Sequence, residues 1–282
     1  MKWAVGSPAV LKNTVTTTDA NGQVTTDFTA TAAGTVMLSV SAGERSASQE
    51  GHFTTNLAAA VIDTMNVTRN GSPANGVTAN SVTIIVKDSS GALVSNANVS
   101  LNADKSTVMF GRAAKAGAAS GKTFQTDSQG SLTIEFTDTV AETVLLSAAL
   151  DNGNTKTATA SFVADNVSAK IIDLVATSGA LANGIATNQA TGTLVDANDN
   201  PLAQTDVNWS QSGSAVLGTS AKTDVNGNTT VTFTDTKSQT VTITAALANG
   251  NSLSRQSTFL ADNSTAKVSE LTVTPDSSPA DG

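Results

Sequence analysis

The chain repeats one five-residue string three times: Thr18-Asp19-Ala20-Asn21-Gly22, Thr126-Asp127-Ser128-Gln129-Gly130 and Thr223-Asp224-Val225-Asn226-Gly227. The Asp favours a turn because its carboxylate accepts hydrogen bonds from the backbone that follows it, and the Gly supplies a positive φ. The first two copies are 108 residues apart and the last two are 97 residues apart. A spacing of this length predicts tandem domains of about 100 residues each.

Other markers recur with the same spacing. Two sets of phenylalanines do so, Phe28, Phe136, Phe233 and Phe53, Phe162, Phe259. The string Ala-Asn-Gly or Ala-Asp-Gly occurs at 74–76, 182–184 and 280–282. This register predicts the C-terminal half of an incomplete domain at 1–56, complete domains at 57–165 and 166–262, and the first strand of a further domain at 263–282.

Hydrophobic residues alternate with Thr and Ser inside each repeat. Val241, Ile243 and Ala245 lie between threonines, and 36–40 and 144–148 show the same pattern. A period of two predicts strands with one buried face, and many short strands between turns predict an all-β fold. We therefore expect tandem immunoglobulin-like antiparallel β-sandwiches. The short linkers, 162–166 and 259–263, favour an elongated rod.

The composition argues against several classes of function. With 15 basic and 23 acidic residues the net charge is −8, and no basic cluster offers a surface for nucleic acid. The chain has no cysteine, so disulfides, thiolate metal sites and cysteine nucleophiles are excluded. His52 is the only histidine, and a single histidine on a strand is better explained as an exposed side chain than as part of a catalytic triad. We expect neither an enzyme nor a cofactor.

Apolar stretches such as 82–86 and 144–150 are much shorter than the roughly 20 residues of a membrane helix, so no membrane insertion by this segment is expected. Residues near Met1 do not form a secretory signal, and if the protein is exported its signal is expected outside this chain.

One string has the composition of a calcium site. Asp196-Ala197-Asn198-Asp199-Asn200 matches the Asp-x-Asn-Asp-Asn string that binds calcium between cadherin repeats. It lies inside a predicted domain, where the preceding repeat has Asp88-Ser89-Ser90-Gly91 with a single acid. We predict a hydrogen-bonded turn and no metal site. The boundary residues Asp165 and Asp262 are too few for the roughly six to eight oxygen ligands of calcium.

Two tryptophans, Trp3 and Trp209, occupy equivalent positions, which we predict to be in the core. Tryptophans in the core are not available for sugar rings to stack on. This weakens the interpretation that the chain is an accessory carbohydrate-binding domain.

The longer spacing between the first two turns locates an insertion at residues 111–122. Its glycines and small residues predict a surface loop. Three basic residues, Arg112, Lys115 and Lys122, make this loop the candidate for contact with a partner in an otherwise acidic chain. The simpler alternative is a tolerated insertion with no role of its own.

Together these strings resemble the bacterial Ig-like group 1 (Big-1) domains of the intimin and invasin family of inverse autotransporters. The similarity is carried by the Ala-Asn-Gly strings, by 86–94 and 194–202, by the Thr-Asp-x-x-Gly turns, and by the closing Phe-x-Ala-Asp-Asn at 162–166 and 259–263.

The resemblance implies a non-catalytic, extracellular stalk segment of a bacterial surface adhesin that acts in cell adhesion and virulence. Such a segment would be a rigid spacer that presents a distal receptor-binding tip, anchored in the outer membrane by regions outside this chain. Its partners would be the neighbouring Ig-like units, with a host cell-surface or matrix protein bound by regions outside this chain. The alternative is a direct binding module that contacts a host protein or another adhesin copy through edge strands or loop 111–122.

Overall fold

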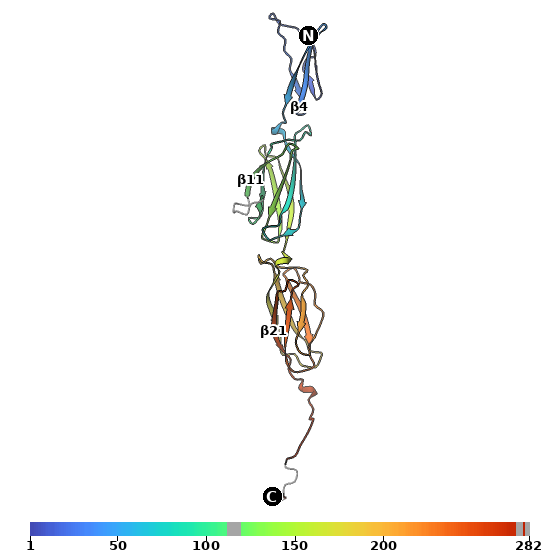
Figure 1. Ribbon diagram of the computed structural model, residues 1–282, viewed down its shortest axis with the longest axis vertical. Helices are drawn as coiled ribbons and strands as arrows, with labels where there is room; N and C mark the ends of the chain where they lie inside the picture. Colours follow the sequence, from blue (N-terminus) through green and yellow to red (C-terminus); the bar gives the residue numbers. More distant parts are fainter. Residues whose placement is uncertain (112–119, 275–278, 280–282) are drawn as a thin grey trace. The chain divides into compact units, whose positions relative to one another are not determined.

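The computed structural model describes residues 1–111, 120–274 and 279. In this part of the chain the regular elements are β-strands and three single-turn 3-10 helices, which confirms the predicted all-β class (Figure 1). The chain divides into two compact units, Met1–Val163 and Ala164–Gly282. Among the described residues, no helix has the length and apolar character needed to span a bilayer.

Residues 1–56 form two small sheets. One has the order β1-β4-β5 and the other pairs β2 with β3, every pair being antiparallel. The strands are β1 (Lys2–Val5), β2 (Ala9–Leu11), β3 (Phe28–Ala30), β4 (Gly34–Ala42) and β5 (Arg45–Phe53). Val36 is the one buried side chain of this part. A half-size sandwich therefore folds here with very little core.

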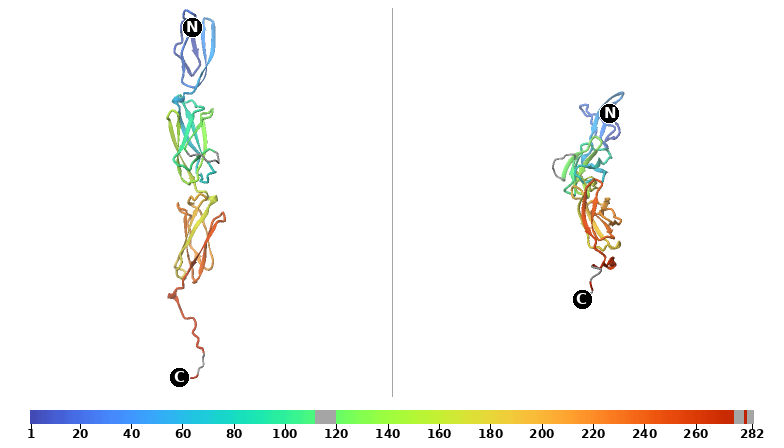
Figure 2. Two further views of the ribbon diagram at one scale, coloured as in Figure 1. Left: turned by 90° about the vertical axis from the view of Figure 1, so that its left-hand side faces the viewer. Right: turned by 60° about the horizontal axis from the view of Figure 1, so that its bottom comes forward.

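Residues 57–163 form a complete sandwich of a four-stranded sheet, β10-β12-β8-β6, and a five-stranded sheet, β11-β9-β13-β14-β7 (Figure 2). Neighbouring strands are antiparallel except β7 and β14. The elements are η1 (Leu57–Ala59), β6 (Val61–Arg69), β7 (Ser72–Pro73), β8 (Asn80–Lys87), β9 (Asn98–Ala103), β10 (Met109–Phe110), β11 (Ser120–Gln125), β12 (Ser131–Thr137), β13 (Thr143–Leu150) and β14 (Thr155–Val163).

The second unit repeats this architecture with a four-stranded sheet, β15-β16-β19-β18, and a three-stranded sheet, β17-β20-β21. Its elements are η2 (Asn166–Ser168), β15 (Lys170–Ala176), β16 (Asn188–Val195), β17 (Asn208–Gln211), β18 (Val216–Leu217), β19 (Asn228–Thr234), β20 (Thr240–Ala246), β21 (Ser252–Thr258) and η3 (Asn263–Thr265). Residues 266–274, part of a predicted strand, have no strand conformation, because a strand needs a neighbour for its backbone hydrogen bonds.

The recurrent phenylalanines form one aromatic pair in each repeat. Phe136 of β12 and Phe162 of β14 meet edge-to-face with ring centroids 5.8 Å apart, and Phe233 and Phe259 do so at 5.9 Å. Phe28 and Phe53 form the same pair at 5.5 Å. In the two complete sandwiches each pair joins residues of both sheets in the core, which explains why the two sets recur together.

The tryptophans differ from the core positions we predicted. Trp3 and Trp209 are both half-buried, whereas Leu101, which occupies the same place in the other sandwich, is fully buried. There, Phe124 of β11, which lies opposite Val99 of β9, packs against the core. The second unit has no strand equivalent to β11, and Trp209 packs against its core instead. A larger side chain thus compensates for the absent strand.

Shortening this side chain tests that compensation. Trp209→Leu is expected to lower the free energy of unfolding of the second unit by about 2 kcal/mol, because no strand supplies a replacement for the lost ring. Trp209→Phe should retain most of the stability. Urea unfolding followed by circular dichroism measures both, and equal stability of Trp209→Leu and wild type would contradict the explanation.

Candidate functional site at the start of each sandwich

A one-turn 3-10 helix precedes the first strand of each sandwich, and its first backbone donors are capped by an Asn or Asp side chain. Asn56 Oδ1 accepts from Ala58 N at 3.1 Å, and Asp165 Oδ1 accepts from Val167 N at 3.1 Å. Asp262 caps η3 in the same way, with Ser264 N donating at 3.0 Å. The short connections therefore have a defined backbone conformation.

A hairpin of the same sandwich binds this turn from one side. In the first sandwich Asn152 Nδ2 lies 2.8 Å from Ala60 O, and Asn154 Oδ1 accepts from Ile62 N at 2.8 Å. The second sandwich repeats both contacts. Asn249 Nδ2 donates to Ala169 O at 2.7 Å, and Asn251 Oδ1 accepts from Ile171 N at 2.8 Å. We call the 3-10 turn and these asparagines the linker clamp.

A buried aspartate binds the turn from the other side. Asp196 is fully buried, and its Oδ2 accepts from Asp165 N at 3.0 Å and from Asn200 Nδ2 at 2.9 Å. Its Oδ1 accepts from Asn198 N and Asn200 N. Asp88 has the same role in the first sandwich, where the backbone of Asn56 donates to it. The carboxylate of Asp196 is thus saturated by N–H donors, and that of Asp88 also accepts from Ser90 Oγ at 2.6 Å.

The calcium-like string is therefore a turn, as predicted, and the described residues contain no cluster of three or more acidic or histidine side chains able to hold a metal. From the sequence we expect the string inside a domain and not at a boundary. It does lie inside a domain along the chain, but the fold brings it against the linker residue Asp165.

These contacts lower the pKa of Asp196. Burial would raise it, but the hydrogen bonds from Asp165, Asn200 and Asn198 outweigh burial and hold the pKa below its ordinary value of 3.8. The contribution of Asp196 to stability is therefore present above the unfolded pKa and is lost as pH falls through the lower folded pKa.

Replacing this carboxylate should loosen the clamp. Asp196→Asn turns an amide towards N–H donors, and we expect it to destabilise the second unit by about 3 kcal/mol at pH 7. Asp199→Asn is the matched control, since Asp199 has an exposed carboxylate that pairs only with Lys170 at the surface, 3.1 Å away. Urea unfolding at pH 7 measures both, and equal effects of the two substitutions would contradict the role of Asp196.

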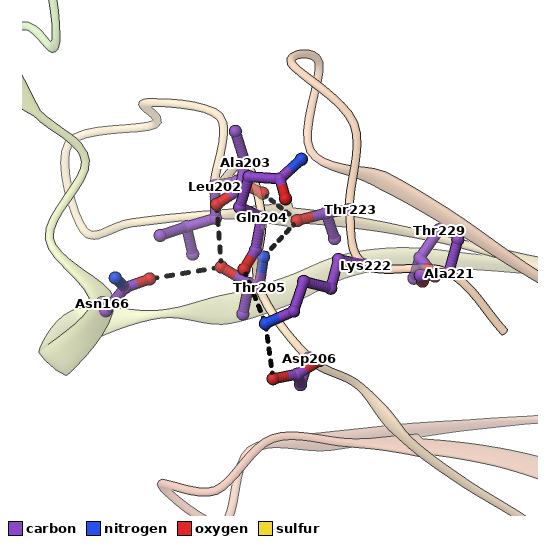
Figure 3. Close-up of polar contacts among 10 residues, drawn as sticks. All are labelled: Asn166, Leu202, Ala203, Gln204, Thr205, Asp206, Ala221, Lys222, Thr223 and Thr229. Carbon is purple, nitrogen blue, oxygen red and sulfur yellow. Dashed lines mark hydrogen bonds and ion pairs between the residues drawn. The ribbon is translucent and has the colours of Figure 1, made fainter.

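The repeated turn string contributes a buried hydroxyl near the linker clamp. Thr223 is fully buried, its Oγ1 donates to Leu202 O at 2.5 Å, and Thr205 N donates to it at 2.9 Å (Figure 3). Thr205 Oγ1 in turn lies 3.2 Å from Asn166 Oδ1 of η2. Thr126 makes the equivalent contacts with Val94 O and Ala97 N. In the two complete sandwiches the first residue of the string, Thr126 or Thr223, is therefore a buried bridge between two loops, whereas Thr18 is exposed.

The Asp of the string forms the predicted turn in all three copies. Asp19, Asp127 and Asp224 each accept from the backbone N of the residues two and four positions later. The closing glycines have φ of +77°, +61° and +77°. These acids are structural, as predicted.

The basic residues predicted for partner contact are not brought together in the described structure. Arg112 and Lys115 lie outside the described residues. Lys122 is in β11, half-buried, and its Nζ donates to Phe110 O at 2.9 Å. Residues 120–122 are thus part of a strand paired with β9, not of a surface loop, because their backbone groups bond to an edge that is open in the second unit.

His52 is exposed on β5, and its Nδ1 lies 2.9 Å from Thr35 Oγ1. This confirms the interpretation of a single exposed histidine on a strand. Sequence reasoning missed the linker clamp, although a signal was present: Leu150-Asp151-Asn152-Gly153-Asn154 and Leu247-Ala248-Asn249-Gly250-Asn251 share an Asn-Gly-Asn string at the repeat spacing.

Comparison with known proteins agrees with this architecture. The chain is 29% identical over 268 residues to the inverse autotransporter adhesin YeeJ of Escherichia coli (strain K12), which covers 92% of this chain and 11% of that protein. This chain thus spans about a tenth of the curated relative it matches.

Solved structures share the fold. Invasin, described as a bacterial integrin-binding protein, matches 92% of this chain and 52% of its own with a TM-score of 0.56 and 18% identity. The Escherichia coli adhesin FdeC matches 93% of this chain and 85% of its own with a TM-score of 0.55 and 14% identity. YeeJ and FdeC are both described as adhesins.

A family model matches both complete sandwiches, at residues 62–163 and 171–260, and each match begins shortly after the 3-10 turn that precedes the sandwich. The matched residues make up more than half of the chain. The predicted family is therefore confirmed, and the chain belongs to the bacterial Ig-like domain (group 1) family.

Proposed function

We propose that this chain is a non-catalytic spacer in the extracellular stalk of a bacterial surface adhesin, where it presents a distal receptor-binding tip. The linker clamp carries this proposal. A spacer must limit bending at its connections, and here the two 3-10 turns that precede the complete sandwiches are each hydrogen-bonded by a hairpin and by a buried aspartate of the sandwich that follows.

The family-model matches at 62–163 and 171–260 support the proposed domains 57–165 and 166–262, which are flanked by the proposed partial domains 1–56 and 263–282. The family and the adhesin relatives support a location on the bacterial cell surface, with an outer-membrane anchor and host-protein binding outside this chain.

Removing the clamp should make the connection flexible. Asn249→Ala deletes the donor to Ala169 O, and combined with Asn251→Ala it frees the start of β15. Small-angle X-ray scattering of the full 282-residue chain should show an elongated particle for wild type and a broader distribution of distances for the double variant. Asn226→Ala is the control, because Asn226 lies in the exposed turn of the repeated string and takes part there through its backbone N.

A wild-type particle as flexible as the double variant would overturn the spacer proposal.

The role of the inserted segment has its own test. In an adhesin that carries this segment, deleting residues 112–119 should leave cell adhesion unchanged for a spacer and abolish it for a module that binds through Arg112 and Lys115.

A further inference from the structure

Strand β17 is an edge strand of the second unit, with no strand paired to its outer side. Strand β17 ends the sheet β17-β20-β21, whereas β9, its equivalent in the first sandwich, pairs with β13 on one side and with β11 on the other. Residues 164–274 are all described, so the open edge of β17 is a feature of the described structure. Such an edge offers unpaired backbone groups to another strand.

The register shows which backbone groups face outward. Ser212 N donates to Thr242 O at 3.0 Å, and β17 pairs with β20 in the same antiparallel register. Since hydrogen-bonded pairs alternate along an antiparallel ladder, Asn208 and Ser210 direct their N–H and C=O groups to β20. Trp209 and Gln211 therefore direct theirs to the open edge.

Two buried side-chain atoms on the same strand are also without a partner. They are Trp209 Nε1, which is a donor, and Gln211 Oε1, which is an acceptor. The two residues are two positions apart, so their side chains lie on the same face of the strand. Leaving a buried polar atom without a hydrogen bond costs about 1–3 kcal/mol of stability, so an arrangement that gives these two atoms partners is favoured.

We propose that the β17 edges of two copies of this chain pair with each other, antiparallel and centred on Ser210. This register places Trp209 of one copy directly opposite Gln211 of the other, and the reverse, so that the outward backbone groups of both residues are bonded. It also makes the side chains of Trp209 and of the other copy's Gln211 cross-strand neighbours on the same face. Both halves of the contact are the same, as a twofold interface requires.

The surroundings of the edge permit this contact. Residues 207–212 contain no charged residue and no proline, the features by which proteins block strand addition. The acidic residue nearest to the edge in sequence, Asp206, precedes the strand, and its Oδ2 lies 2.8 Å from Lys222 Nζ (Figure 3). This inference goes beyond the spacer role and does not depend on it.

Engineered cysteines test the pairing, because the chain has none of its own. Two Ser210 residues would face each other across the twofold axis as a non-hydrogen-bonded pair, at a Cα separation of about 4.5 Å that suits a disulfide. The full-length Ser210→Cys chain should oxidise to a covalent dimer at least about tenfold faster than Ser254→Cys, whose side chain is equally exposed on β21.

A second variant separates backbone pairing from chance collision. Gln211→Pro removes an outward N–H without breaking the ladder to β20, and in the Ser210→Cys background it should abolish the faster cross-linking while circular dichroism shows a folded chain. Equal rates for Ser210→Cys and Ser254→Cys overturn the proposal, as does fast cross-linking that survives Gln211→Pro. Preferential cross-linking of Ser210→Cys to a Thr123→Cys chain would assign the edge to β11 of another copy and overturn the twofold arrangement.

Discussion

Gly227→Ala should unfold the second unit at temperatures where the wild type is folded. Gly227 has a φ of +77°, and a Cβ at this position would overlap Leu194 O and lie 3.2 Å from Leu202 N. Leu194 belongs to β16 and Leu202 to the loop that follows it, and the repeated turn packs against both, since Leu194 N donates to Gly227 O and Leu202 N to Leu194 O. We expect a loss of at least about 3 kcal/mol, or roughly 15 °C in Tm.

Gly250→Ala is the matched control within the same unit. Its φ is +89°, but nothing lies within 4 Å of the added Cβ, so only the backbone strain of about 1 kcal/mol applies. Fluorescence of Trp209 in a Trp3→Phe background follows the unfolding of this unit alone. If both variants lose the same stability, the close approach of Leu194 O is not what requires glycine.

Gln239→Glu should destabilise the second unit by about 3 kcal/mol at pH 7. Gln239 Nε2 donates to Asp235 Oδ2 at 2.7 Å and to Ser214 Oγ at 2.6 Å, and Asp235 is only 1% exposed. The substitution removes the donor and sets a second carboxylate against a buried one.

The same site predicts a pH dependence. In wild type, burial would raise the pKa of Asp235, but hydrogen bonds from Lys237, Gln239, Ser214 and Thr236 hold it below its ordinary value. In Gln239→Glu the repulsion of two carboxylates raises the folded pKa of one of them above its unfolded value. Stability is then higher below that unfolded pKa and falls as pH rises through the folded pKa, so the variant should recover part of its loss on acidification.

The first sandwich supplies the reciprocal experiment. Glu142 occupies the position of Gln239, and Asp138 Oδ2, in a residue 1% exposed, has no hydrogen-bond partner. Glu142→Gln should therefore stabilise this sandwich by about 1 kcal/mol, although it gives up the partly exposed ion pair with Lys105 at 3.4 Å. Urea unfolding at pH 7 and at lower pH measures both substitutions. Changes of the same sign in the two sandwiches would contradict the proposed equivalence.

The comparison of the two sandwiches shows how one fold accommodates different local solutions. In the first sandwich β11, which begins within the inserted segment, covers one sheet edge and supplies Phe124 to the core. Without it, the second unit uses Trp209 and leaves the edge of β17 open. This sheet edge is thus covered by β11 in the first sandwich, whereas in the second unit it is a candidate contact surface.

The sequence by itself determined the fold class, the repeat and the turns. Its markers are local: alternation with period two, an Asp followed by a Gly, and phenylalanines at a constant spacing report on backbone conformation and burial within a few residues. The family followed from these strings as well, because their order along the chain is preserved.

Only the tertiary structure decided which of these residues meet. The calcium-like string lies next to Asp165 although 31 residues separate Asp165 from Asp196, and Asn249 reaches Ala169 across 80 residues. The half-burial of Trp209 and the open edge of β17 likewise depend on a strand that is present in one repeat and absent from the other. The physical reason is that hydrogen-bond saturation, burial and edge pairing are properties of neighbours in space, which a periodic pattern along the chain does not specify.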